Sequence, residues 1–520
     1  MLDSRVATHR AAAAAHPVSL LGRLYRLVRD NRALVVLLAA ATVIRLLIMI
    51  AYQPALSFGG DSASYIEASY LPLRPKATFA IGYVPFLKLF RPTGTLFSVV
   101  AAQHLLGLLM AVAIYAVLRH RGVRTWLACL AVVPILFDSL ELVLEHAIMV
   151  ETFAMSLMVA AFVLLLWPRK PGVLVSFLAG GLLISAWFVR APLIPVVVLV
   201  GIYLAIRRIG WLPWLAFVVA AGVPYTVIVT AIGDRVSPYT ANYTSYYGRV
   251  AGFAKCDQLT LTDAERALCP SPAVSGHEPG WYIWVSESPG YPYRNNGANY
   301  PVLRQFAIDV VRQQPMDYLR VAGTETAAQF VDGVPLRTEY QCTRQQYTFP
   351  RSFNWAEPAG PTCRTDLASG DFRVLPRDWR DTPLATPLST AIEKYGLYVR
   401  TPHLAILGTY ILVGAAAIVA MRGRRRRRAA SAAPTDELPA DSVAPRLTED
   451  TTDAAPETGP LTRDAVMLAV VGLAIIVLPV AVFMYEARYA LPALPLVGLA
   501  AGLSAEALLR NRAKRRERVL

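Results

Sequence analysis

The chain has 520 residues, of which 55% are hydrophobic and only 17% are charged. A soluble protein of this length normally carries about a quarter charged residues. The deficit lies in apolar runs of about 20 residues, which is the length that crosses a bilayer. The composition therefore argues against an ordinary soluble domain. It predicts an all-α, polytopic membrane bundle, because a backbone in lipid must satisfy its own hydrogen bonds.

The formal net charge is +15, which in a soluble protein would suggest a nucleic-acid partner. Here the Lys and Arg residues gather at the ends of the apolar runs, as they do at the cytoplasmic ends of membrane spans. No basic stripe is interleaved with aromatic residues. We therefore expect a plasma-membrane protein surrounded by lipid, and no nucleic-acid partner.

Residues 1–32 form a basic N-terminal region, and the apolar run that follows is too long for a cleaved signal. We therefore expect an uncleaved first span and a cytoplasmic N-terminus. Seven transmembrane helices are predicted within 33–232, with a first outer loop at 52–96, and three more follow residue 402. The ten predicted spans are residues 33–51, 97–118, 125–141, 147–167, 172–189, 192–207, 211–232, 403–421, 465–485 and 489–509.

Orientation follows from the basic joints between spans. With the N-terminus inside, the strongly basic segments all fall on the cytoplasmic side; they are residues 119–124, 169–170, 207–208, 422–428 and the tail 510–520. Two polar segments remain. Residues 233–402 are predicted to be an extracytoplasmic insert of α+β or irregular structure. Residues 422–464 are predicted to be a disordered cytoplasmic linker, because after the Arg run they are rich in Ala, Pro, Thr, Asp and Glu.

Four of the five cysteines, Cys256, Cys269, Cys342 and Cys363, lie in the insert, and Cys129 lies in a span. Four cysteines allow three pairings. Local pairing, Cys256 with Cys269 and Cys342 with Cys363, closes the shortest loops. A metal site is the alternative, but it lacks CxxC spacing, and an outer compartment favours disulfides.

The first outer loop contains the segment 59–67, in which Asp61 follows two glycines. Glycines allow the backbone to approach a ligand closely. A short amphipathic stretch follows at 62–70, for which Asp61 or Ser62 is a plausible helix N-cap. Asp61 is thus either a cap or a functional carboxylate, and we treat it as the leading candidate.

Three further polar clusters are predicted at the same side of the membrane, where polar groups at span mouths are functional candidates. One contains Glu141, Glu145 and His146, followed by Glu151, which suits a metal or a basic substrate group or else a wet loop. The others contain Arg190 and Arg488, which suit phosphate recognition or anchoring at the interface. Their convergence predicts a site for a polar head group on an apolar tail.

Motifs of several enzyme classes are absent. The sequence has no GxxxxGK[ST] phosphate loop, no GxSxG elbow, no HExxH zinc helix and no CxxCH haem site. ATP-driven transport and standard hydrolase chemistry therefore lose support.

The order of the remaining motifs resembles the GT-C superfamily of membrane glycosyltransferases, such as protein O-mannosyltransferases, aminoarabinose transferases and actinobacterial arabinofuranosyl- and mannosyltransferases. The matching segments are Asp61 with Tyr65, Ile81-Gly82-Tyr83-Val84-Pro85, Glu145 with Glu151, Arg190-Ala191-Pro192, and Arg488-Tyr489 followed by Pro492 and Pro495. The resemblance covers residues 33–232 and 403–509. Many members have two adjacent acids in the first loop, whereas this chain has Asp61 alone, with Glu67 two turns on.

The resemblance implies a hexosyl- or pentosyltransferase that uses a polyprenyl-phosphate sugar donor. Asp61 would act as general base on a cell-envelope glycan, lipid or protein acceptor, with inversion. Arg190 and Arg488 would neutralise the leaving phosphate, and the insert would select the acceptor. Glu145 and Glu151 would orient the sugar or hold a divalent cation, and Tyr65, Glu67 and His146 are further substrate-binding candidates. The alternatives are a carrier or flippase for a lipid-linked sugar, and an assembly factor on an inactive fold.

Overall fold

The computed structural model describes residues 28–72, 81–232, 240–293, 299–336, 347–350, 386–431 and 458–517. Within these residues the chain is helical and contains no β-strand, apart from one isolated bridge between Leu56 and Ala147. The predicted all-α architecture is therefore confirmed for the described residues.

Long apolar helices form the bundle. Among the described residues, six stretches are long and apolar enough to cross a membrane. The helices that carry them are α2 (Arg32–Ala51), α5 (Phe97–His120), α11 (Trp211–Ile232), α19 (His403–Ser431), α20 (Thr458–Val482) and α21 (Leu494–Glu517). A seventh crossing would combine α6 (Thr125–Phe137) with α7 (Ser139–His146), which are bent by 50°.

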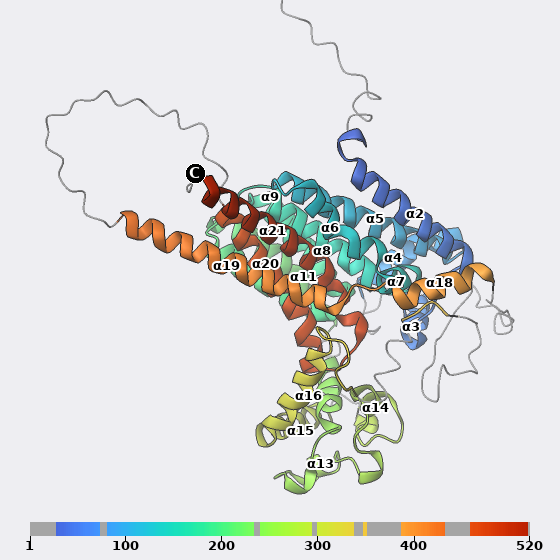
Figure 1. The fold of residues 1–520 in the computed structure, drawn as a ribbon. Helices are drawn as coiled ribbons and strands as arrows, with labels where there is room; N and C mark the ends of the chain where they lie inside the picture. Colours follow the sequence, from blue (N-terminus) through green and yellow to red (C-terminus); the bar gives the residue numbers. More distant parts are fainter. Residues whose placement is uncertain are drawn as a thin grey trace, which may run out of the picture.

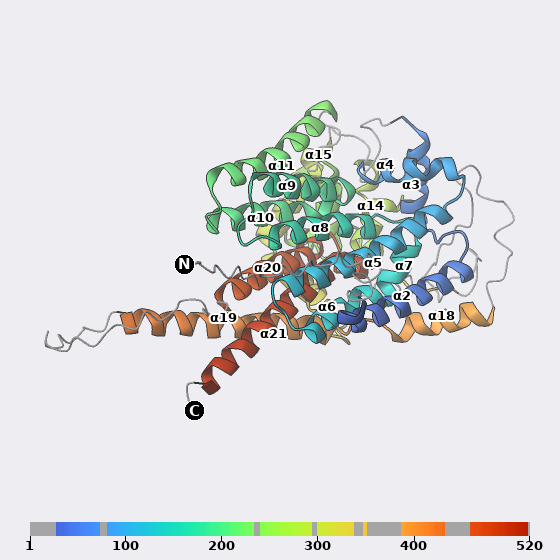
Figure 2. The same ribbon diagram turned by 90° about the horizontal axis from the view of Figure 1, so that it is seen from above.

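Three apolar helices are shorter than a full span: α8 (Glu151–Leu166), α9 (Val173–Val189) and α10 (Ile194–Ile206). Each predicted span therefore coincides with a helix, but the number of crossings, ten, stays a prediction. Figure 2 shows α9, α10 and α11 at one edge of the bundle, and α2 and α18 (Pro387–Tyr398) at another.

Glycines allow two of the helix pairs to approach closely. A Cβ on Gly180 of α9 would overlap the carbonyl oxygen of Phe217 on α11, and one on Gly498 of α21 would overlap that of Ala131 on α6. Small residues at such contacts let helix backbones pack directly in a membrane, where no hydrophobic effect drives helices together.

The insert forms a helical lobe below the bundle in Figure 1. Its described helices are α12 (Thr240–Ala251), α13 (Asp263–Arg266), α14 (Pro279–Trp284), α15 (Tyr300–Gln313) and α16 (Pro315–Ala327). In α15 the buried residues Leu303, Phe306, Ala307 and Val310 follow helical spacing. The α+β alternative is therefore wrong for the described part, because this spacing specifies a helix that packs by one face.

The predicted local cysteine pair is present: Cys256 and Cys269 lie at the distance of a disulfide bond. Cys342 and Cys363 lie outside the described residues, and Cys129 is buried and free. Both ends of the predicted linker 422–464 are helical, because α19 continues to Ser431 and α20 begins at Thr458.

The first loop contains α3 (Gly59–Tyr70) and α4 (Tyr83–Phe90).

Candidate functional site

Asp61 lies in the first turn of α3, and its side chain is 43% exposed. The helix begins at Gly59 after Phe58, and no side chain caps it. The expectation that Asp61 or Ser62 is the N-cap is therefore wrong. Instead the Ser62 hydroxyl accepts the Phe58 N–H and donates to the Ile148 carbonyl, which ties this turn to the segment before α8. Because the Asp61 carboxylate does not cap the helix, it can pair with another residue.

That partner is Arg488, in a 3₁₀ turn between α20 and α21. Its Nη1 donates to Asp61 Oδ2 at 2.8 Å and lies 3.8 Å from Glu151 Oε1. Glu151 is the buried first residue of α8, and Arg190 Nη1 lies 3.5 Å from the same oxygen. The structure thus brings together four residues that the sequence placed in separate clusters: Asp61, Glu151, Arg190 and Arg488.

Both arginines have spare hydrogen-bonding capacity. Among the described residues, Arg190 Nη1 and Arg488 Nε are buried without a hydrogen-bond partner, and so is Glu151 Oε2. Arg190 Nη2 reaches the Arg488 carbonyl at 3.5 Å, so the two side chains adjoin. Guanidinium groups bind phosphate or carboxylate through two parallel hydrogen bonds. Unused donors on two adjoining arginines suit an anion with several oxygens.

Aromatic rings border the arginines. The Arg488 guanidinium lies 4.7 Å from the centre of the Phe58 ring, and Phe58 stacks on Tyr347 at 5.0 Å. Arg190 lies 5.2 Å from the centre of the Tyr489 ring. Cations are attracted to ring faces at such distances. Phe58 and Tyr347 were missed in the sequence, because neither carries a charge and Tyr347 lies in the long insert.

Glu486 lies two residues before Arg488 and belongs to the same polar cluster of the sequence. Its residue surface is 4% exposed. Burial raises the pKa of the Glu486 carboxyl above its ordinary value, while Arg488 and Tyr347 act in the opposite direction. An acid beside an arginine at a span mouth is the pattern that placed this carboxyl in the cluster from the sequence.

Of the remaining candidates on α3, one borders the cluster and one does not. Tyr65 is buried edge-on against Tyr83, and burial raises the pKa of its hydroxyl, with a further contribution from Asp61. Glu67 is exposed and takes part in none of the ion pairs of the described residues. The structure therefore does not assemble Glu67 with the other predicted residues.

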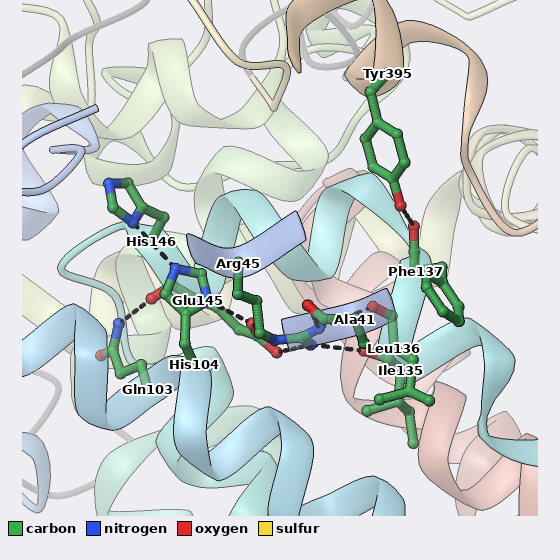
Figure 3. Close-up of polar contacts among 10 residues, drawn as sticks. All are labelled: Ala41, Arg45, Gln103, His104, Ile135, Leu136, Phe137, Glu145, His146 and Tyr395. Atoms are coloured by element: carbon green, nitrogen blue, oxygen red, sulfur yellow. Dashed lines mark hydrogen bonds and ion pairs between the residues drawn. The ribbon is translucent and has the colours of Figure 1, made fainter. Parts of the chain in front are cut away.

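Glu145 and His146 belong to a second network, inside the bundle (Figure 3). Glu145 accepts from Arg45 Nη2 at 2.7 Å and Nε at 2.8 Å. Its Oε2 also lies 2.7 Å from His104 Nδ1. His104 Nε2 lies 3.1 Å from His146 Nδ1, and His146 Nε2 lies 2.7 Å from the Tyr52 carbonyl. Glu145 is fully buried, so its carboxylate is engaged by protein groups rather than open to a substrate.

Arg45 also closes the break between α6 and α7 (Figure 3). A helix end leaves its last carbonyls without partners in the helix. Arg45 donates to the carbonyls of Leu136 and Ile135 at 2.9 and 3.3 Å, and the Tyr395 hydroxyl donates to Phe137. Arg45 was not among the residues predicted from the sequence, although an arginine inside an apolar span is itself a signal of a functional or structural role.

A link runs from this network towards α3. Gln103 donates to the Glu145 and Ala147 carbonyls at 2.9 and 2.7 Å, and it accepts from the Tyr83 hydroxyl at 2.7 Å. Tyr83 in turn packs against Tyr65. The buried network therefore supports the helix that carries Asp61.

The described residues contain no group of three His, Cys, Asp or Glu side chains that could hold a metal ion. Glu145 and Glu151, the pair that the sequence suggested for a cation, take part in different ion pairs. The two carboxylates therefore belong to separate ion-pair networks, and the divalent cation stays a prediction.

A groove of about 440 Å³ runs between α6, α19 and α21, and its lining is almost entirely apolar. Leu130, Pro134, Ala405, Leu412 and Val497 are among the residues that line it.

The groove ends at the polar residues Asp138, Arg400 and Thr401. Asp138 accepts the Thr401 N–H at 2.6 Å. Arg400 donates to the Tyr347 carbonyl at 3.2 Å, and the Tyr347 ring stacks on Phe58, which lies beside Arg488.

These features define a multi-pass α-helical membrane protein with a polar cluster at the side of the bundle that carries α3. No protein-family model, characterised protein or solved structure matches the chain.

Proposed function

We propose that this protein is a membrane glycosyltransferase that moves a sugar from a polyprenyl-phosphate donor to an extracytoplasmic cell-envelope acceptor. One observation carries the proposal: two adjoining arginines, largely buried and with unused donors among the described residues, lie beside a half-exposed carboxylate. Arg190 and Arg488 suit the phosphate of a lipid donor. Asp61 suits an acceptor that arrives from the aqueous side.

In the proposed reaction, the acceptor hydroxyl oxygen attacks the anomeric carbon as the bond from that carbon to the phosphate oxygen breaks. The hydroxyl proton passes to the Asp61 carboxylate. The phosphate leaves with the bonding electron pair, and Arg190 and Arg488 stabilise its charge. Attack from the face opposite the leaving group inverts the anomeric centre. General-base assistance of this kind contributes roughly 10²–10⁴ in rate.

The apolar groove offers a place for part of the donor's hydrocarbon chain. It follows α6 from Leu127 to Phe137, which at about 1.5 Å per residue is roughly 15 Å, or half of a bilayer core. Arg400 and Tyr347 connect its polar end with the arginine cluster. The insert lobe would then contact the acceptor, since it lies on the same side of the bundle as α3 (Figure 1).

The test uses purified protein, a polyprenyl-phosphate sugar and a cell-envelope acceptor fraction, and it measures release of free polyprenyl phosphate. We expect release by the wild type and by Asp30→Asn, but none by Asp61→Asn. Asp30 is exposed just before α2 and lies outside both the cluster and the insert lobe, so this control makes the same substitution away from the proposed site.

A fully active Asp61→Asn variant would contradict the assignment of the base. If instead the lipid-linked sugar crosses the membrane of a proteoliposome without being cleaved, the protein is a carrier and the proposed enzyme activity is wrong.

A further inference from the structure

We propose that Glu486 must be protonated for the arginine cluster to bind the phosphate of the lipid donor, so that the donor and one proton from solution bind together. This role of Glu486 rests on the proposed function and adds a residue to it. Glu486 takes no part in the transfer of the sugar. Its charge decides whether the phosphate can enter the site.

Glu486 is a buried carboxyl without a cation of its own. Its residue surface is 4% exposed. Arg488, two residues further on, pairs instead with Asp61 at 2.8 Å and lies 3.8 Å from Glu151, and Glu486 takes part in none of the ion pairs within the described residues. A carboxyl that is removed from water without a close cation is more stable in its neutral form. The surroundings of Glu486 therefore favour the protonated state.

The cluster also holds more acids than bases. Its positive charges come from Arg190 and Arg488, and its acids are Asp61, Glu151 and Glu486. If all three acids were ionised, a phosphate would enter a largely buried site that is already negative, where like charges repel strongly. With Glu486 neutral, two carboxylates face two guanidinium groups. The phosphate then adds only its own charge.

The groups that act on Glu486 come from several elements, and they are Arg488, Tyr347, Asp61 and Glu151. Burial has the largest effect and raises the pKa of the Glu486 carboxyl; Arg488 and Tyr347 oppose it, whereas the two acids add to it. A phosphate beside Arg488 is a further negative charge and acts in the same direction as those acids. Phosphate binding therefore favours a proton on Glu486, and by reciprocity that proton favours phosphate binding.

The test is a binding measurement that needs no turnover. The full-length protein is placed in neutral phosphatidylcholine nanodiscs, and the Kd for the methyl diester of a short-chain polyprenyl phosphate is measured from pH 6 to pH 9. A diester keeps one negative charge over this range, whereas a monoester titrates at about pH 6. The wild-type Kd should rise by about tenfold or more, because ionised Glu486 must regain a proton before the anion binds. Glu486→Gln, which does not ionise, should bind with a Kd that is independent of pH.

Two further variants separate the proton from the side chain. Glu486→Asp keeps an ionisable carboxyl and should keep the pH dependence. Glu517→Gln makes the same substitution at the exposed end of α21 and should behave as the wild type does.

Three results would overturn the role of Glu486 while leaving the proposed function intact. They are a wild-type Kd that is equal at pH 6 and pH 9, a Glu486→Gln variant with the pH dependence of the wild type, and a Glu486→Gln variant that does not bind at pH 6. A wild-type protein that does not bind the diester at any pH would overturn this role and the proposed function together.

Discussion

Arg45 and Glu145 lie 100 residues apart in the sequence and form a two-pronged ion pair at 2.7 and 2.8 Å inside the helix bundle. Their side chains are 2% and 0% exposed. Arg45 belongs to the first apolar helix, and Glu145 belongs to α7, beyond the bend from α6. This pair therefore fixes the position of α7 against α2, and α7 leads directly to Glu151 in the candidate site.

Replacing Arg45 with Met should strongly destabilise the protein. The change leaves Glu145 buried without its main cation, and breaking a buried pair from one side costs about 3–5 kcal/mol. The measurement is thermal unfolding in detergent, followed by circular dichroism. The double variant Arg45→Met with Glu145→Gln should recover part of the loss, because it removes the unpaired charge. A single variant as stable as the wild type would contradict this account of the network.

Gly107 on α5 should tolerate no side chain. A Cβ at this position would overlap the Glu145 carboxylate and approach Arg45. We expect Gly107→Ala to destabilise by about 1–3 kcal/mol, as overpacking of a filled interior does. Gly181→Ala on α9 is the matched control, because nothing lies within 4 Å of its Cβ position. Equal melting temperatures for the two variants would show that Glu145 can move away.

The sequence was sufficient to locate the helices, because apolar runs of membrane length have few other solutions. It also predicted that Asp61, Glu151, Arg190 and Arg488 would meet at one side of the bundle. It could not predict that Arg45 pairs with Glu145, since that depends on how α2 and α7 are set against each other in space. For the same reason Glu145 was predicted to bind substrate, whereas its carboxylate is engaged by Arg45 and His104.

Local chemistry explains the other differences. Asp61 was a plausible cap by residue type, but α3 begins two residues earlier, at Gly59. Glu67 was included for its charge, yet it lies exposed on α3. The groove between α6, α19 and α21 combines residues from three distant segments, so no single stretch of sequence contains its signature.

Glu486 should make stability depend on pH. Burial raises the pKa of its carboxyl in the folded state above the unfolded value of about 4.5. The folded protein therefore binds this proton more tightly than the unfolded chain does. The resulting stabilisation is present below that unfolded value and is lost as the pH rises through the folded-state pKa.

The measurement compares Glu486→Gln with the wild type in thermal unfolding at pH 5 and pH 8. Because Gln does not ionise, the variant should gain stability relative to the wild type at the higher pH. If the difference between the two proteins is the same at both pH values, the Glu486 carboxyl does not titrate in this way.

Sidedness of the membrane can be tested by labelling. The distribution of basic joints predicts that the insert lobe is outside and both termini are inside. Glu287→Cys and Arg512→Cys are suitable probes, because both positions are exposed. In intact cells a membrane-impermeant maleimide should label the cysteine at 287 but not the one at 512, and permeabilised cells should show both. The opposite pattern would invert the topology and remove the extracytoplasmic acceptor from the proposal.

Arg190 and Arg488 should not be replaceable by Lys. Lysine keeps the positive charge but lacks the planar fork that holds a phosphate through two hydrogen bonds. If the arginines stabilise the leaving phosphate, each Lys variant should lower kcat more than it raises KM in the release assay. Arg91→Lys is the control, since Arg91 also lies over an aromatic ring, that of Tyr70 at 4.5 Å, but outside the cluster. If a Lys variant at 190 or 488 has an unchanged kcat, that arginine anchors the fold and does not stabilise the leaving phosphate.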